Sequence, residues 1–200
     1  MAIVQQKAPS FRSKAVVDGN IVDVSLADYL GRWVVLFFYP LDFTFLCPTE
    51  LKAYEAIHDQ FEALETTVIG CSIDSVYTHQ AWQKAPAEEG GLGALSFIHM
   101  SDVGGRIAKQ YGVLGESGEA LRAIFLIDKE GIVRHESVND MAVGRNSAET
   151  LRILQAFQHS EISGELCPAN WSAGAGGISV PRSGDTAPHA TRATGEFESA

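Results

Sequence analysis

Apolar and polar positions group into two alternating kinds of segment, which predicts an α/β fold. The run Trp33–Tyr39 (WVVLFFY) is apolar on both faces, which is typical of a buried central strand. Residues Thr67–Asp74 (TVIGCSID) have the same character and predict a second buried strand. Between the two strands, apolar residues three or four apart predict one helix from Pro48 to about Glu65.

The second half of the chain continues the alternation. The segment THQAWQKAP predicts a short helix that ends at Pro86, and GRIAKQYGV predicts another that stops at Gly112. Two apolar runs flank the turn DKEG at 128–131, which indicates a β-hairpin. Asn146 and Glu149 then have the spacing of a capping box and begin a last helix. The expected layout is a four- or five-stranded mixed sheet with helices on both faces, followed by a mobile tail rich in small residues.

Composition and charge limit the classes of function. A chain of 200 residues with 46% hydrophobic content can form one core of ordinary size. Its formal net charge of −10 argues against a nucleic-acid or anionic-membrane partner. No apolar run approaches the roughly 20 residues needed to span a bilayer. The first residues, MAIVQQKAPSF, lack the apolar segment of a signal peptide, so a cytoplasmic location is expected.

The chain has three cysteines, Cys47, Cys71 and Cys167. They are too few for a secreted disulfide framework, and none belongs to a CxxC or CxxH unit, so no structural zinc site is expected. The six histidines form no HxH or HxxxH pair, and neither a metal nor an organic cofactor is expected. Cys71 lies in an apolar strand and is expected to be an inert core residue.

Cys47 has a different context, at the start of the first predicted helix. It precedes Pro48, a residue favoured at the first helical position, and Glu50 follows it as in a capping box with sulfur as the cap. Free backbone N–H groups and the helix dipole favour the thiolate there. Thr44 lies within reach of the sulfur or its ligand, and Pro40 stiffens and shields the loop. We interpret Cys47 as an activated nucleophile; the alternative is an inert filler at a helix end.

Several motifs resemble those of one family. YPLDFTFLCPTE resembles the peroxiredoxin active-site motif Pro-x-x-x-Thr-x-x-Cys, and GELCPANW resembles the resolving-cysteine segment of the typical two-cysteine subfamily, which includes thioredoxin peroxidase and the peroxidase component of alkyl hydroperoxide reductase. The segments LRAIFLID, GGLG and VNDMAVGR resemble the same subfamily, and the match runs roughly from Ala2 to Trp171. The resemblance implies a thioredoxin-like peroxidase domain at 1–160 and a C-terminal arm at 161–200.

The resemblance also implies a role for each residue of the site. Cys47 would be the peroxidatic cysteine, which attacks peroxide and becomes a sulfenic acid without any cofactor. Thr44 would orient the peroxide, and Arg122 would stabilise the thiolate and the breaking O–O bond. Without the resemblance, Arg122 would be interpreted as an exposed strand arginine.

Three further residues are expected to support this site. Glu50 and Arg145 resemble a pair that fixes the active-site arginine, although an ordinary surface ion pair is the alternative. Tyr39 would hydrogen-bond nearby, and core packing is an equal alternative for it.

Cys167 would attack the sulfenic acid and form a disulfide between two subunits. The resemblance therefore implies an obligate homodimer, assembly of dimers into a decamer, and local unwinding that brings the two sulfurs together. The substrates would be hydrogen peroxide and organic hydroperoxides, in antioxidant defence and redox homeostasis. Thioredoxin and a flavin-dependent disulfide reductase both remain open as electron donor.

One departure from the family pattern leads to a prediction. Readily over-oxidised relatives combine a GGLG loop with a C-terminal Tyr-Phe motif, whereas this chain has Gly90–Gly93 but only Phe197 near its end. We therefore expect resistance to sulfinic-acid formation.

Two rival functions remain. A thiol–disulfide oxidoreductase is disfavoured by the missing CxxC motif, and a holdase chaperone would bind clients independently of Cys47.

Overall fold

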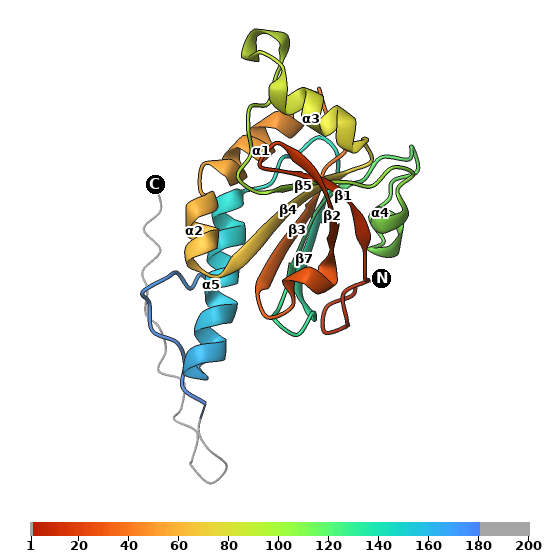
Figure 1. Cartoon of the computed structure of the whole chain (residues 1–200). Coiled ribbons are helices and arrows are strands. Elements are labelled where there is room, and N and C mark those ends of the chain that lie inside the picture. The colour runs from red at the N-terminus through yellow and green to blue at the C-terminus, as the bar shows by residue number, and fades with distance from the viewer. Residues whose placement is uncertain (1, 181–200) are drawn as a thin grey trace. The chain divides into compact units, whose positions relative to one another are not determined.

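A seven-stranded mixed sheet in the order β2-β1-β5-β4-β3-β6-β7 forms the centre of the fold (Figure 1). This computed structural model describes residues 2–180. The strands are β1 (Arg12–Val17), β2 (Asn20–Ser25), β3 (Trp33–Phe38), β4 (Thr66–Ser72), β5 (Ile98–Ser101), β6 (Arg122–Ile127) and β7 (Val133–Asn139). The helices are α1 (Cys47–Glu55), α2 (His58–Ala63), α3 (Val76–Lys84), α4 (Arg106–Gln110) and α5 (Ser147–Ser163), with 3-10 turns at Leu26–Tyr29 and Ala87–Glu89. None of the described helices combines the length and the apolar character needed to cross a membrane.

The α/β class with a mixed sheet is confirmed, but the expected number of strands is wrong. The described residues contain seven strands because the β1–β2 hairpin joins the sheet through β5. The pattern of apolar residues does not predict β1, β2 and β5, and each has a physical reason. The strands β1 and β2 carry mostly exposed or half-buried side chains at the sheet edge, and β5 is only 4 residues long.

β3 lies inside the sheet, between parallel β4 and antiparallel β6. Its side chains alternate between two aromatic layers. On one face, the Phe37 ring stacks on Tyr54 of α1 with ring centroids 4.4 Å apart. On the other face, the centroid of the Phe38 ring lies 5.5 Å from that of Tyr111 and 6.0 Å from that of Phe125. Because both faces of β3 are covered, every one of its residues is buried, as its continuous apolar sequence predicts.

The single helix predicted from Pro48 to Glu65 is wrong. Two helices, α1 and α2, occupy this segment, and Ile57 between them has the non-helical angles φ −125° and ψ 18°. The apolar stripe continues across the break, because Leu51, Tyr54 and Phe61 are all fully buried. Helical spacing alone therefore does not reveal the break, although a β-branched residue such as Ile57 has a lowered helix propensity.

Three predicted stops and turns are confirmed. The helix α3 ends at Lys84, before Pro86, and α4 is followed by Gly112 in the left-handed conformation at φ 71°. The hairpin turn after β6 is closed by Asp128, whose side chain accepts hydrogen bonds from the backbone N–H groups of Glu130 and Ile132.

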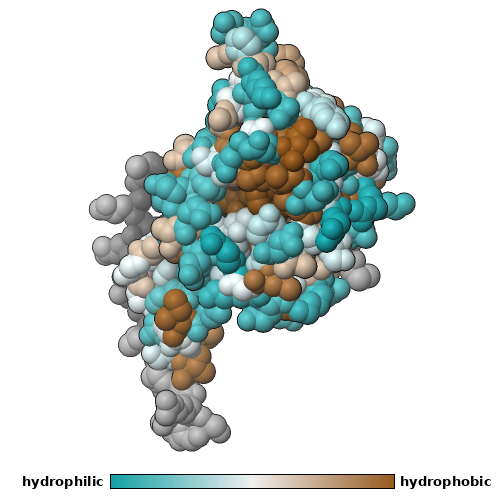
Figure 2. Space-filling view, viewed as in Figure 1, coloured by the Kyte–Doolittle hydropathy of each residue, from teal (hydrophilic) through white to brown (hydrophobic). Residues whose placement is uncertain are grey.

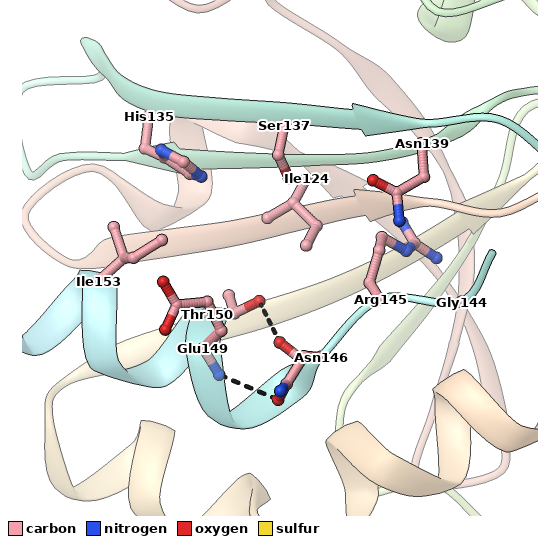
Figure 3. A pocket seen from close by; sticks show the side chains of 10 residues that line it. All are labelled: Ile124, His135, Ser137, Asn139, Gly144, Arg145, Asn146, Glu149, Thr150 and Ile153. Carbon is pink, nitrogen blue, oxygen red and sulfur yellow. Dashed lines mark hydrogen bonds between the residues drawn. The ribbon is translucent and has the colours of Figure 1, made fainter. Parts of the chain in front are cut away.

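Only half of the capping box predicted for the last helix forms. The side-chain oxygen of Asn146 accepts from the backbone N–H of Glu149 at 3.1 Å, as Figure 3 shows. The Glu149 carboxylate is hydrogen-bonded to Arg152. Of these two residues, only Asn146 therefore caps the start of α5.

Contacts divide the chain into two units, Met1–Leu154 and Gln155–Ala200. Within the described part of the second unit, an isolated bridge joins Leu166 to Ile178, and Trp171 is buried. The sulfur of Cys167 is half-buried and lies 3.3 Å from the carbonyl of Ala156. Phe197 lies outside the described residues.

Candidate active site

Cys47 is the first residue of α1, and the loop from β3 leads directly into it. Its side chain is only 1% exposed. The cap residue is Leu46, which makes no side-chain capping bond, so the expected capping box with sulfur as the cap is wrong. The carboxylate of Glu50 has other partners, as described below. The sulfur nevertheless lies at the helix end, where backbone N–H groups lack intrahelical acceptors.

Arg122 begins β6 and reaches the sulfur from the neighbouring strand. Its Nη1 lies 3.4 Å from Sγ of Cys47 and 2.6 Å from Oε2 of Glu50. Its Nε donates to the carbonyl of Met141 at 2.7 Å. Arg122 is 5% exposed, so the exposed-arginine alternative does not hold. Three partners on different segments fix the guanidinium in place.

Glu50 joins two arginines. Its Oε1 accepts from the backbone N–H and the Nε of Arg145 at 2.9 and 2.7 Å, and its Oε2 accepts from Arg122. Burial alone would raise the pKa of Glu50, but the hydrogen bonds and charge of Arg145, with the charge of Arg122, outweigh it and lower the pKa. The side chains of Glu50 and Arg145 are each 2% exposed, so this is no surface ion pair. Two cations facing one carboxylate leave a net positive charge beside the sulfur.

Arg145 is itself held by the sheet. Its Nη1 donates to the carbonyls of Phe38 and Ala123, and its guanidinium lies 5.4 Å from the centre of the Phe37 ring. Figure 3 shows the arginine between the strands and the start of α5. Arg145 therefore connects Glu50 to the ends of both β3 and β6.

A pocket of about 410 Å³ opens onto the sulfur. Among the residues lining it are Pro40, Thr44, Phe45, Cys47, Arg122 and Met141. The Thr44 hydroxyl donates to the carbonyl of Leu41 at 3.0 Å, which leaves its oxygen lone pairs available. The pocket is mainly apolar and contains one guanidinium, so it suits a small ligand that accepts hydrogen bonds.

Tyr39 does not approach the sulfur among the contacts of the described residues. Its hydroxyl donates to Oδ1 of Asp42 at 2.6 Å and also contacts Nε2 of His99. His79 binds the other carboxylate oxygen of Asp42 at 2.7 Å. Sequence reasoning missed Asp42, His79 and His99, because the two histidines come from α3 and β5 and no local spacing relates them.

These three residues are also the one group in the described chain whose atoms could converge on a metal, within 4.8 Å of one another. Two ligands of one tetrahedral zinc ion lie about 3.3 Å apart, given bonds of about 2.0–2.1 Å. The Asp42–His79 contact of 2.7 Å is shorter and is a hydrogen bond. The Asp42–His79 spacing therefore does not fit a tetrahedral zinc site.

Cys71 is fully buried in β4, as the sequence predicts. Burial raises the pKa of its thiol well above the ordinary value, and the charge of Asp102 acts in the same direction. The neutral thiol is a poor nucleophile. Cys71 therefore behaves as a core residue.

Comparisons with known proteins identify relatives of this chain. The chain matches the AhpC/TSA family over residues 4–136 and the C-terminal domain of 1-Cys peroxiredoxin over residues 156–187. It is 49% identical over 174 residues to peroxiredoxin prdx-2 of Caenorhabditis elegans, which covers 86% of this chain and 87% of the relative. It is also 49% identical over 170 residues to the human mitochondrial thioredoxin-dependent peroxide reductase, covering 84% of this chain and 66% of the relative.

A crystal structure of reduced 2-Cys peroxiredoxin from Plasmodium vivax superimposes with a TM-score of 0.86 at 44% identity, covering 88% of this chain and 93% of that one. The two structures share the thioredoxin-like fold over most of both chains. The buried thiol at a helix start, the adjacent arginine and these relatives lead to one conclusion: the chain belongs to the AhpC/TSA family and is a peroxiredoxin, a thiol-dependent antioxidant peroxidase.

Proposed function

We propose that this peroxidase works by a two-cysteine cycle that begins at Cys47. The Cys47 thiolate attacks the terminal oxygen of a hydroperoxide; an S–O bond forms as the O–O bond breaks. The leaving oxygen takes a proton and departs as water or an alcohol, and the sulfur is oxidised to a sulfenic acid. The observation that carries this proposal is the 3.4 Å contact between Arg122 and the sulfur, at the base of an open pocket.

Each neighbour has a separate role in this step. Thr44 orients the peroxide through its hydroxyl, and Arg122 stabilises the charge that develops on the two oxygens. Pro40 shields the sulfur from water. Glu50 and Arg145 act through Arg122, because their ion pairs fix its guanidinium. All five residues are held by hydrogen bonds or line the pocket, which supports a preorganised site.

Cys167 completes the cycle. Its thiol attacks the sulfenic sulfur of Cys47, a disulfide forms, and the sulfenic oxygen leaves as water. Since Cys47 is only 1% exposed, the start of α1 must unwind before the sulfurs meet at bonding distance. In our proposal the two sulfurs come from different protomers.

A homodimer is then the smallest active unit, and dimers assemble into a decamer. Figure 2 shows an apolar surface patch surrounded by polar residues on the face turned to the viewer. Such a patch is typical of a protein–protein contact and supports self-association.

A dithiol must reduce the disulfide for turnover. The name of the human relative, thioredoxin-dependent peroxide reductase, supports thioredoxin as the donor, and a flavin-dependent disulfide reductase is the second candidate. Hydrogen peroxide and organic hydroperoxides are the proposed substrates, and the mainly apolar pocket supports the organic class. We place this activity in the cytoplasm, without nucleic-acid or membrane partners.

The experiment is non-reducing gel electrophoresis with and without one equivalent of peroxide. We expect a dimer band that appears on oxidation and disappears with dithiothreitol, in the wild type and in Cys71→Ser. Neither Cys47→Ser nor Cys167→Ser should form this band. Cys167→Ser should still consume one peroxide per Cys47 but should not turn over with thioredoxin. Wild-type turnover in Cys167→Ser would contradict the two-cysteine cycle.

A further inference from the structure

A fully buried polar cluster, formed by Tyr39, Asp42, His79 and His99, lies beneath the loop that leads to Cys47. The Asp42 carboxylate accepts from the Tyr39 hydroxyl at 2.6 Å and binds Nδ1 of His79 at 2.7 Å. The Tyr39 hydroxyl also contacts Nε2 of His99. The side chains of Asp42, His79 and His99 are all 0% exposed. No step of the proposed cycle uses these groups.

The hydrogen-bond partners determine where the protons lie. Nε2 of His79 faces the carbonyl of Met100 at 3.1 Å and must carry a proton, since a carbonyl only accepts. The amide of Gln83 donates to Nδ1 of His99 at 3.0 Å, so the proton of a neutral His99 is on Nε2 and points to Tyr39. The Tyr39 proton then goes to Asp42.

One proton therefore remains between Asp42 and Nδ1 of His79. The pair is either a carboxylate with an imidazolium or a carboxylic acid with a neutral imidazole, and both have zero net charge. Without that proton, a carboxylate oxygen and a nitrogen lone pair would face each other at 2.7 Å inside the protein. Unpaired buried charge of this kind is costly.

Asp42 also fixes the backbone of the loop. Its N–H donates to the Asp74 carboxylate at 2.9 Å, so both its side chain and its main chain are bound. The next residue, Phe43, has φ 53°, a backbone conformation that is strained for a residue with a side chain. The centroid of its ring lies 5.7 Å from that of Trp82. Thr44 follows directly. The Thr44 hydroxyl donates to the carbonyl of Leu41, so Phe43 lies between two residues that are both fixed by hydrogen bonds.

We propose that Asp42 is a positioning residue of the peroxidase reaction: through the proton it shares with His79, it fixes the loop that presents Thr44 to the peroxide. The inference rests on the proposed roles of Cys47 and Thr44. His79 and Tyr39 hold Asp42, and His99 supports Tyr39 from the far side of the cluster.

The hydrogen bond between Asp42 and His79 is expected to depend on pH, because titratable groups surround it. The titratable groups that face Asp42 are Tyr39 at the end of β3, Asp74 after β4, His79 on α3 and His99 on β5. Burial raises the pKa of Asp42, against the hydrogen bond and charge of His79, and burial lowers the pKa of His99 well below its ordinary value. Loss of the proton shared across the 2.7 Å Asp42–His79 contact would leave an uncompensated buried negative charge, so we expect alkaline pH to release the loop.

Two substitutions at one position separate positioning from bulk stability. Asp42→Ala removes every side-chain bond, and the rate of Cys47 oxidation should fall about 100-fold, the effect of a misplacement of about 1 Å. Asp42→Asn can donate to Nδ1 of His79 and accept from Tyr39 without a shared proton, so it should recover most of that loss. The rate of the wild type should fall at alkaline pH, and this alkaline limb should be absent in Asp42→Asn.

A double-mutant cycle with Thr44→Val tests the path of the effect. If Asp42 acts by placing Thr44, the Thr44→Val change should cost much less in Asp42→Ala than in the wild type. Asp128→Ala is the matched control, since it removes a buried carboxylate that fixes the turn at the other end of β6. It should lower the melting temperature but leave the rate within about twofold of the wild type.

Independent effects of the Asp42 and Thr44 changes would overturn the proposal. So would an alkaline limb in Asp42→Asn equal to that of the wild type, and this comparison remains decisive if Asp42→Ala does not fold. A Cys47→Ser protein that still reduces peroxide would instead refute the proposed cycle, so the two failures can be told apart.

Discussion

Nη1 of Arg122 lies 3.4 Å from the sulfur of Cys47, and this same nitrogen lies 2.6 Å from the Glu50 carboxylate. A guanidinium Nη carries two N–H groups, so one can serve each partner. The Glu50 carboxylate therefore orients the arginine while the arginine contacts the sulfur of Cys47. This relationship joins the proposed chemistry to the buried ion pairs.

Replacement of Arg122 by lysine should lower the rate constant for Cys47 oxidation by about 10²–10³-fold, the cost of losing a preorganised donor at a developing charge. A lysine keeps the charge but cannot bind Met141, Glu50 and the sulfur with one planar fork. Competition against a haem peroxidase for hydrogen peroxide measures this rate. The control is Arg134→Lys, at a half-exposed ion pair in the β6–β7 hairpin, which should be neutral. If the Arg122→Lys protein reacted at the wild-type rate, Arg122 would have no part in the reaction.

Glu50→Gln should reduce the free energy of unfolding by about 3 kcal/mol at neutral pH, because it leaves two buried arginines short of a counter-charge. The pKa of Glu50 is lower in the folded protein than its ordinary value of 4.5. The stabilisation is thus complete above pH 4.5 and is lost as pH falls through the lowered folded value. Urea unfolding of both proteins from pH 7 to pH 3 should show the difference shrinking in acid. A difference that grows in acid would reverse the sign of this linkage.

Cys47 should resist sulfinic-acid formation under excess peroxide. The sequence has the Gly90–Gly93 loop but lacks the C-terminal Tyr-Phe motif, so disulfide formation with Cys167 should outpace a second oxidation. Mass spectrometry after graded peroxide treatment, with thioredoxin and its reductase present, measures both products. Sulfinic acid accumulating ahead of the disulfide would contradict the prediction.

Gly91→Ala should destabilise the protein, by about 1–3 kcal/mol or more if the loop cannot shift. A Cβ at this position would lie 1.9 Å from the carbonyl oxygen of Ala85. The matched control is Gly176→Ala, where nothing lies within 4 Å of the added carbon. Thermal unfolding should show a lower melting temperature for the first variant only. Equal melting temperatures would mean that the loop after α3 rearranges freely.

Local rules predict the parts of this protein that depend on neighbouring residues. The continuous apolar run of β3, the turn closed by Asp128 and the position of Cys47 at a helix start all follow from short segments. The burial of Cys71 follows from its strand in the same way. In each case the physical cause acts within a few residues along the chain.

The rest depends on distant contacts. Asp42 meets His79 37 positions away, and Tyr39 meets His99 60 positions away, so no spacing in the sequence relates them. Tertiary contacts also change where Glu50 points: a capping box is the local choice, but two arginines from other elements bind the carboxylate more strongly. The outer strands β1 and β2 join the sheet only through the long-range pairing of β1 with β5, and most of their side chains are exposed or half-buried.

Tyr54 anchors the C-terminal end of α1. Its ring stacks on Phe37, its hydroxyl is hydrogen-bonded to Thr150 at 2.9 Å, and α1 is only 9 residues long. We expect amide hydrogens near Tyr54 to exchange more slowly than those at the first turn of the same helix, and equal exchange rates would contradict this. In the proposed cycle, a first turn that unwinds for disulfide formation would refold onto the turn that Tyr54 holds, so no new helix would have to nucleate in each catalytic round.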